Sequence, residues 1–224
     1  MGPDDRHHKR RIKGTRNLQR RKAKRSSYDK VLIVCEGEKT EPHYFNKLIE
    51  FYKLNTANVE VDGACGSSPS SVFEHAVHLS DAQKKKGDPF DRVYCVFDKD
   101  SHETFDQTIR KISEVKPKKV YHAAVSVPCF EYWLLLHFQY TTRPYAGTGK
   151  LTIANEVLKD LKKAMPDYTK GSTDIFNSLV SLIETAKENA TRSLESAIAN
   201  DTDNPTTHIH DLVDYLQNLK NIVP

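Results

Sequence analysis

The chain has 224 residues, a length that suits one α/β domain with a helical extension. Its formal net charge is +4, but residues 1–30 carry 12 Lys or Arg against three acids, so a strongly basic head precedes a mildly acidic body. No apolar run approaches the roughly 20 residues of a membrane span, and no apolar segment follows the first charges, so we expect neither a membrane helix nor a secretory signal.

The head of the chain has almost no large apolar side chains and cannot bury a core of its own. Residues 1–29 are therefore predicted to form a solvated basic arm. Such an arm would also attract the phosphates of a nucleic acid, RNA or DNA, without reading its sequence. The side chains expected to bind nucleic acid are Arg10, Arg11, Arg20, Arg21, Lys22 and Arg25.

Apolar segments of strand length then alternate with amphipathic segments. VLIVC, at residues 31–35, is apolar on both faces, which is typical of a central strand in a parallel sheet covered by helices. Ser71 with Glu74 makes a possible capping box for the second helix. The expected strands cover residues 31–35, 59–61, 92–98 and 120–125, and the expected helices begin near Pro42, Ser71, Phe105 and Phe130. This alternation predicts an α/β fold, with a mostly parallel sheet flanked by helices, over residues 30–140.

The remaining residues, 141–224, are predicted to form a C-terminal helical extension packed on this core. TTRPYAGTGK, at residues 141–150, is typical of a loop or hinge. Beyond this loop we expect helices alone, over residues 151–165, from Asp174 to about Ala199, and after Pro205.

Four cysteines lie about thirty residues apart, without a C-x-x-C pair. Cys35 and Cys95 fall inside predicted buried strands, where a cysteine packs as a small apolar residue. We therefore expect a reduced, cytoplasmic protein without structural zinc or disulfides.

Acidic residues directly follow the two most apolar of the predicted strands. Glu36 follows VLIVC, and Asp98 and Asp100 follow the strand VYCVF. Ligands of open α/β sheets bind outside the carboxyl ends of the strands, so these three acids would converge if the strands are neighbours. Like charges so close need a cation between them, and Mg²⁺ prefers oxygen ligands. The pattern predicts a metal site for Mg²⁺, or for Mn²⁺ in its place.

The turn after the first strand, EGEKTE, contains further candidates. Gly37 lets the backbone turn tightly and lets a ligand approach. Lys39 and Thr40 lie in the same turn, where an ammonium or a hydroxyl could meet a phosphate. Glu41 is expected at the start of a helix, where the helix dipole alone would favour an acid. Glu41 is therefore either a structural residue or a ligand of a second metal.

Two more polar residues lie beside apolar or acidic segments. Glu131 precedes the most apolar helix, where a carboxylate has to bind metal, face the sheet edge or pair with Lys or Arg. His102 follows D-K-D, where it could transfer a proton or hydrogen-bond an aspartate. Trp133 is expected in the core. No role is expected for the histidines that lack metal-ligand spacing: His43, His122 and His137.

Four segments, VLIVCEGEKTEPHYF, CVFDKDSH, SVPCFEYWLLLHF and NPTTHIHDLVDYL, together closely resemble the RloB-like family over about residues 30–218. That family belongs to the Toprim-fold superfamily of topoisomerases, primases and nucleases. The resemblance implies a Toprim-like core, with Glu36 as the acid/base glutamate and Asp98 and Asp100 as the metal-binding pair. It also implies a bacterial or archaeal origin, association with restriction or anti-phage defence loci, and nuclease chemistry. No topoisomerase tyrosine motif or primase zinc module is identifiable.

The leading hypothesis is a Mg²⁺-dependent endonuclease acting on RNA, tRNA by analogy, or on DNA. Glu36, Asp98 and Asp100 would hold one or two metal ions that neutralise the phosphate and activate water. Lys39 would stabilise transition-state charge, and the other candidates are His102 for proton transfer and Glu41 and Glu131 for a second metal. Two alternatives stay open: a catalytically weak regulatory or binding subunit held by a partner ATPase, and transfer of a nucleotidyl or phosphoryl group to a small nucleotide.

Overall fold

The structure is a computed structural model that describes residues 28–56, 58–64, 66–99, 103–149 and 151–221. The six basic residues predicted to bind nucleic acid lie outside the described residues, and so do Asp100 and His102.

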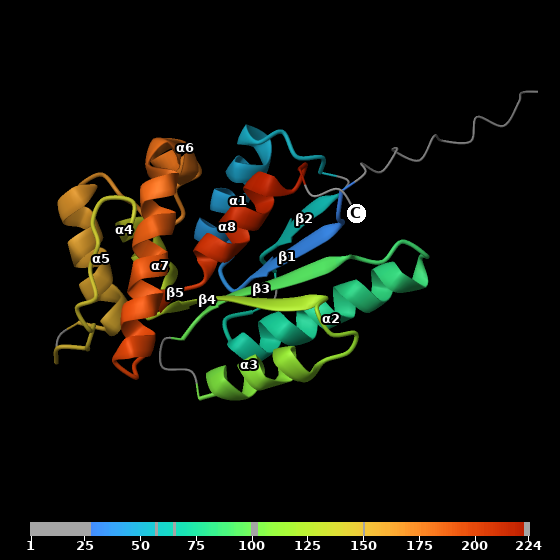
Figure 1. The fold of residues 1–224 in the computed structure, drawn as a ribbon, viewed down its shortest axis with the longest axis horizontal. Helices are drawn as coiled ribbons and strands as arrows, with labels where there is room; N and C mark the ends of the chain where they lie inside the picture. Colours follow the sequence, from blue (N-terminus) through green and yellow to red (C-terminus); the bar gives the residue numbers. More distant parts are fainter. Residues whose placement is uncertain (1–27, 57, 65, 100–102, 150, 222–224) are drawn as a thin grey trace, which may run out of the picture.

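A five-stranded sheet forms the centre of the molecule, with strand order β2-β1-β3-β4-β5 (Figure 1). Its strands are β1 (Val31–Cys35), β2 (Val59–Asp62), β3 (Arg92–Asp98), β4 (Tyr121–Val127) and β5 (Thr206–Thr207). The first four strands run parallel, and β5 pairs antiparallel with the end of β4. The predicted α/β fold with a mostly parallel sheet is confirmed.

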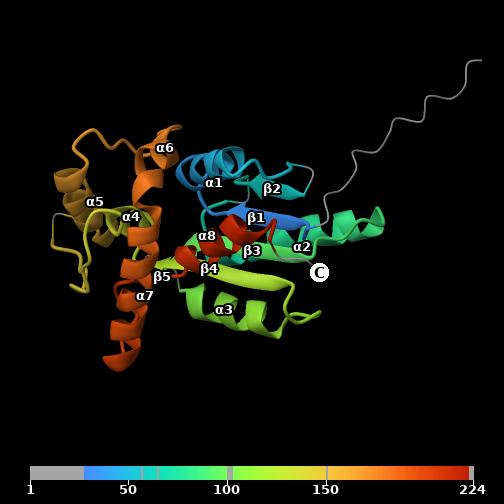
Figure 2. The same ribbon diagram turned by 45° about the horizontal axis from the view of Figure 1, so that its top comes forward.

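Helices cover both faces of this sheet. They are α1 (Thr40–Phe51), α2 (Pro69–Lys85), α3 (Phe105–Glu114), α4 (Phe130–Leu135), α5 (Ile153–Ala164), α6 (Ile175–Leu179), α7 (Ile183–Ala199) and α8 (Ile209–Asn218). α2 and α3 lie on one face, and α1 and α8 on the other (Figure 2). Because side chains alternate along a strand, Val31 and Ile33 pack toward α1 while Leu32 and Val34 pack toward α2. Every residue of β1 is buried, as its sequence predicts.

Helices α4, α5, α6 and α7 form a group beside the carboxyl ends of the strands, on the left of Figure 1. Tyr44 of α1 joins this group to the sheet, since its ring meets Phe130, Trp133 and Phe176 edge-on. Trp133 is fully buried, so its predicted place in the core is confirmed. None of the helices in the described part of the chain is both long and apolar enough to cross a membrane.

Three local predictions were wrong. The capping box of α2 is formed by Ser68 and Ser71, with Ser68 as the N-cap, because Pro69 occupies the first helical position. The single helix predicted from Asp174 is divided into α6 and α7 by a 3₁₀ turn, Val180–Leu182, in which no residue is buried. The extension is not helices alone, because β5 returns to the sheet and Thr207 Oγ1 lies 3.0 Å from Ser126 Oγ.

Candidate functional site

Glu36 and Asp98 meet at the carboxyl edge of the sheet because β1 and β3 are neighbouring parallel strands, with Cys35 opposite Val96. The backbone N–H of Glu36 donates to the Val96 carbonyl over 2.9 Å, which extends the ladder by one residue. The backbone N–H of Asp98 then donates to Glu36 Oε2 over 3.0 Å. The Glu36 carboxylate is therefore held against the end of β3.

Glu41 brings a third carboxylate to the same edge from the first turn of α1. Its side chain folds back over Gly37, where a Cβ would lie 2.9 Å from the Glu41 carboxyl carbon. That space is too small for a carbon atom, so only glycine at position 37 leaves the glutamate where it is. The glycine thus serves the position of Glu41 in addition to the turn.

Glu131 brings a fourth carboxylate from the first turn of α4, and it is only 4% exposed. The Tyr168 hydroxyl donates to Glu131 Oε1 over 3.2 Å, and Lys170 Nζ lies 3.6 Å from the same oxygen. Pairing with a lysine was one of the alternatives for this buried acid, and Lys170 provides it, while the predicted role of Glu131 as a metal ligand stays a prediction.

The four acids repel one another. Burial raises the pKa of Asp98 well above its usual value, and the charges of Glu41, Glu131 and Glu36 raise it further. Burial raises the pKa of Glu41 to about 7, with a further contribution from Glu131. The charge of Glu131 raises the pKa of Lys170, which therefore stays an ammonium. A proton or a cation is needed to stabilise this cluster.

An open cleft of about 630 Å³ lies over Glu36, Glu41 and Asp98, outside the ends of β1 and β3. The whole turn from Glu36 to Glu41 lines it, including Lys39, which the sequence placed near a phosphate. Its lining residues are Glu36, Gly37, Glu38, Lys39, Thr40, Glu41, Gly66, Ser67, Asp98, Lys170 and Gly171.

Lys170 and Gly171, in the loop between α5 and α6, are site residues that the sequence did not predict. The Gly171 N–H donates to Thr40 Oγ1 over 2.9 Å, and its carbonyl lies 3.1 Å from His43 Nδ1. Gly171 has φ +81°, and a Cβ there would lie 3.2 Å from Lys39 Cβ. His43, for which no role was expected, thus helps to hold the loop that brings Lys170 to the cleft.

The predicted metal site stays a prediction. Asp100 lies outside the described residues, and among those described no three His, Cys, Asp or Glu side chains form a metal-binding group. The chemistry of the donors nevertheless fits a hard divalent cation, because Glu36, Glu41 and Asp98 offer carboxylate oxygens to one cleft and Asp98 is disfavoured as an anion without a cation.

Comparison with known proteins gives one family. The family model described as RloB-like protein matches residues 31–216, which is most of the chain. Neither a curated protein nor a solved structure matches the chain.

Proposed function

The chain belongs to the RloB-like protein family, and from that premise we propose that it is a metal-dependent nuclease that hydrolyses phosphodiester bonds in RNA or DNA. The observation that carries the proposal is the convergence of Glu36, Glu41 and Asp98 at a cleft on the carboxyl edge of a parallel sheet, with the charge of Glu131 close enough to raise the pKa of Asp98. Ligands of such sheets bind at this edge. An effector role in anti-phage defence is part of the same proposal.

Glu36 and Asp98 would hold the Mg²⁺ or Mn²⁺ ion, together with Asp100 from the D-x-D pair. The bound ion would supply charge neutralisation at the phosphate and activate a water molecule. Glu36 is already oriented for this by the Asp98 backbone N–H. A ligand fixed in this way needs little reorganisation when the ion arrives.

Lys170 and Lys39 would bind the phosphate oxygens of the substrate. Lys170 is oriented by Glu131 and stays charged, so it presents a fixed cation to the cleft. Lys39 is exposed at the rim of the same cleft. Glu41 completes the acidic cluster, either as a ligand of a second ion or as a proton acceptor.

The proposal is tested by incubating the protein with tRNA, single-stranded RNA, single-stranded DNA and duplex DNA in Mg²⁺, Mn²⁺ or EDTA. We expect cleavage of at least one substrate with a divalent ion and none in EDTA. Asp98→Asn should lower the rate at least about 100-fold, the scale on which removal of one charge-stabilising group acts. Glu38→Gln is the matched control, because Glu38 is an exposed acid at the same cleft. Cleavage by Asp98→Asn at the wild-type rate would refute the mechanism.

A catalytically weak subunit that binds nucleic acid or a partner ATPase is the second candidate. It is favoured by one observation, the position of Lys170 at the cleft with its Nζ 3.6 Å from Glu131 Oε1, where a lysine charge balances part of the acidic cluster without a metal ion. This candidate predicts that the wild-type protein cleaves none of the four substrates in either ion, and that it co-purifies with a partner regardless of Asp98→Asn.

A further inference from the structure

The edge of the sheet opposite the cleft carries a group of lysines. Three of them end α2, and three lie in the loop between α3 and β4. All six side chains are exposed, and within the described residues none of them forms an ion pair: Lys84, Lys85, Lys86, Lys116, Lys118 and Lys119. We refer to these six residues as the lysine edge.

The acids at this edge already have partners. Lys30 Nζ lies 2.6 Å from Asp88 Oδ2, and the Lys30 backbone N–H donates to Asp91 Oδ2 over 2.7 Å. Arg92 Nε lies 3.3 Å from Asp29 Oδ2. The charges of Lys30 and Arg92 balance Asp88 and Asp29, and a backbone N–H stabilises Asp91, so these contacts of the three acids involve none of the six lysines.

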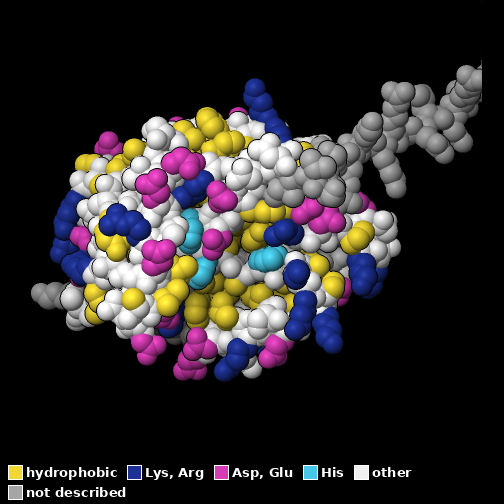
Figure 3. Space-filling model, in the orientation of Figure 1, with side chains coloured by type: hydrophobic (Ala, Val, Ile, Leu, Met, Phe, Trp, Pro, Cys, Tyr) yellow, Lys and Arg dark blue, Asp and Glu magenta, His cyan; other side chains and the backbone are white. Residues whose placement is uncertain are grey.

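The nearest acids along the two helices do not change this balance. Asp81 of α2 and Glu114 of α3 are exposed, and neither pairs with a lysine of the edge in the described part of the chain. Six lysines therefore outnumber the acids Asp81, Asp91 and Glu114 at this edge by three. In Figure 3, Lys and Arg side chains gather at the lower right, over the ends of α2 and α3.

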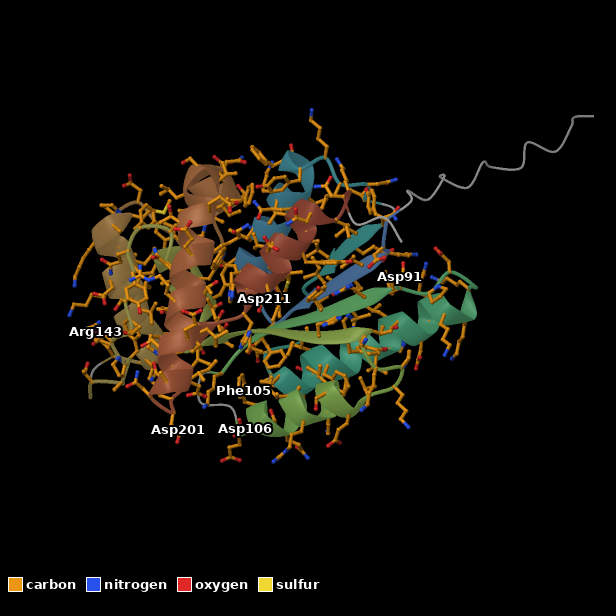
Figure 4. All side chains as sticks on the ribbon, in the orientation of Figure 1. Asp91, Phe105, Asp106, Arg143, Asp201 and Asp211 are labelled. Atoms are coloured by element: carbon orange, nitrogen blue, oxygen red, sulfur yellow. The ribbon has the colours of Figure 1, made fainter. Side chains whose placement is uncertain are left out.

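The lysine edge and the cleft lie at opposite ends of the strands. Asp91, just before β3, marks the edge with the lysines, and Phe105, at the start of α3, marks the opposite edge (Figure 4). β3 has seven residues, and a strand rises about 3.3 Å per residue, so about 23 Å separate the two ends.

The basic arm joins the described chain at the lysine edge. Tyr28 is the first described residue. Its carbonyl accepts a 2.8 Å hydrogen bond from the side-chain amide of Asn58, the residue just before β2. Residues 1–30 hold 12 Lys or Arg against three acids. The most basic segment of the sequence is thus attached where the folded domain has its own exposed lysines.

We propose that the lysine edge is a binding surface for the phosphate backbone of a nucleic acid, separate from the carboxylate cleft. Lysine ammonium groups on exposed loops contact phosphates as point charges and carry no sequence information. If the proposed nuclease function holds, one substrate has to reach both ends of the sheet. The substrate is then a long or folded nucleic acid, because a mononucleotide cannot span about 23 Å.

The test measures the affinity of the full chain for fluorescent tRNA and duplex DNA, in EDTA and at several salt concentrations. Two triple variants, K84Q/K85Q/K86Q and K116Q/K118Q/K119Q, and their combination remove the lysines. We expect the six-fold variant to bind at least about 10-fold more weakly, with the slope of log affinity against log salt reduced by about 0.9 for each lost contact to duplex. The matched control is K159Q/K162Q/K163Q, three exposed lysines of α5, which should bind like the wild type.

The proposal would be overturned if the variant that lacks all six lysines bound with the affinity of the wild type and with the same slope of log affinity against log salt. An equal loss in the α5 control would also overturn it, because the effect would then follow net charge alone. Binding of the wild type to phosphatidylserine vesicles through the same lysines, without binding to nucleic acid, would assign the surface to a membrane instead. Thermal unfolding checks that the variants are folded. Binding is measured without metal and therefore without cleavage. The lysine edge can thus be confirmed as a binding surface even if the protein is not a nuclease.

Discussion

Gly37 shows how the position of one side chain can depend on the absence of another. Its sequence context predicts a turn, but the structure adds that Glu41 fills the space in which a Cβ would lie. The sequence could not show this, because the direction in which the Glu41 side chain turns depends on the three-dimensional arrangement of the residues around the cleft. Similarly, Lys170 enters the site from a loop whose Gly171 is 131 residues from its partner Thr40 along the chain, and no local pattern predicts such a contact.

Gly37→Ala should displace the Glu41 carboxylate at a cost of about 1 kcal/mol, the low end for overpacking, because the methyl group meets only the far end of a flexible side chain. Glu41→Ala removes the side chain that the new methyl group would meet. The cost of Gly37→Ala should therefore be much smaller in the Glu41→Ala background, as urea unfolding of the four proteins of this cycle would show. Equal costs in both backgrounds would mean that the two residues do not compete for this space.

Glu41→Gln should stabilise the protein at alkaline pH when metal is removed. Because the pKa of Glu41 rises from 4.5 to about 7 on folding, the folded state holds more protons than the unfolded state between these values, and stability falls as pH rises through them. Glutamine does not ionise, so the variant avoids this fall in the free energy of unfolding, which amounts to as much as about 3 kcal/mol. An acidic residue at a helix N-terminus stabilises the helix by only about 1 kcal/mol, so the net effect of the substitution at alkaline pH should be stabilising.

Chemical unfolding in EDTA, from about pH 5 to about pH 8, would measure this difference. The free energy of unfolding of the variant should exceed that of the wild type by more as the pH rises, and the two values should converge at about pH 5. A variant that is less stable than the wild type at the alkaline end would show that the helix dipole, and not repulsion within the cluster, dominates at Glu41.

At the scale of elements, strands with long apolar runs were predicted well and short or irregular segments were not. β3 covers the predicted residues because it contains an uninterrupted apolar run, VYCVF, which is a strong signal for a buried strand. β5 has two residues, Thr206–Thr207, which are too few to show any period. The loop between α5 and α6 was missed as a site element because its positions are set by contacts with Thr40 and His43.

Gly171→Ala tests the function of this loop. Alanine at φ +81° costs about 1–2 kcal/mol, and its Cβ would press on Lys39. We expect nuclease activity to fall by more than the loss of stability explains, because Lys170 would be displaced from the cleft. Gly87→Ala is the matched control, since Gly87 has φ +77° and its Cβ would meet nothing. Equal activity in the two variants would show that the loop does not position a functional group.

At the scale of the whole molecule, the two ends of one parallel sheet carry opposite charge. Acids gather at the carboxyl ends of β1 and β3, where the sequence predicted them from E-G and D-x-D. Lysines gather at the other end, three from the end of α2 and three from the loop before β4, two segments that look unremarkable in sequence because each holds so few of them. Only the parallel arrangement of the strands brings each set together, so the acidic cluster could be predicted from strand ends and the lysine edge could not.

The account depends most on a divalent ion bound by Glu36 and Asp98, and calorimetric titration of the wild-type protein with Mn²⁺ tests this directly, without knowledge of the substrate. We expect saturable binding with release of protons, because Asp98 and Glu41 are protonated more easily than ordinary carboxyls. Asp98→Asn and Glu36→Gln should abolish binding, while Glu38→Gln should retain it. Wild-type binding of Mn²⁺ by Asp98→Asn, or no binding by the wild-type protein, would contradict the account.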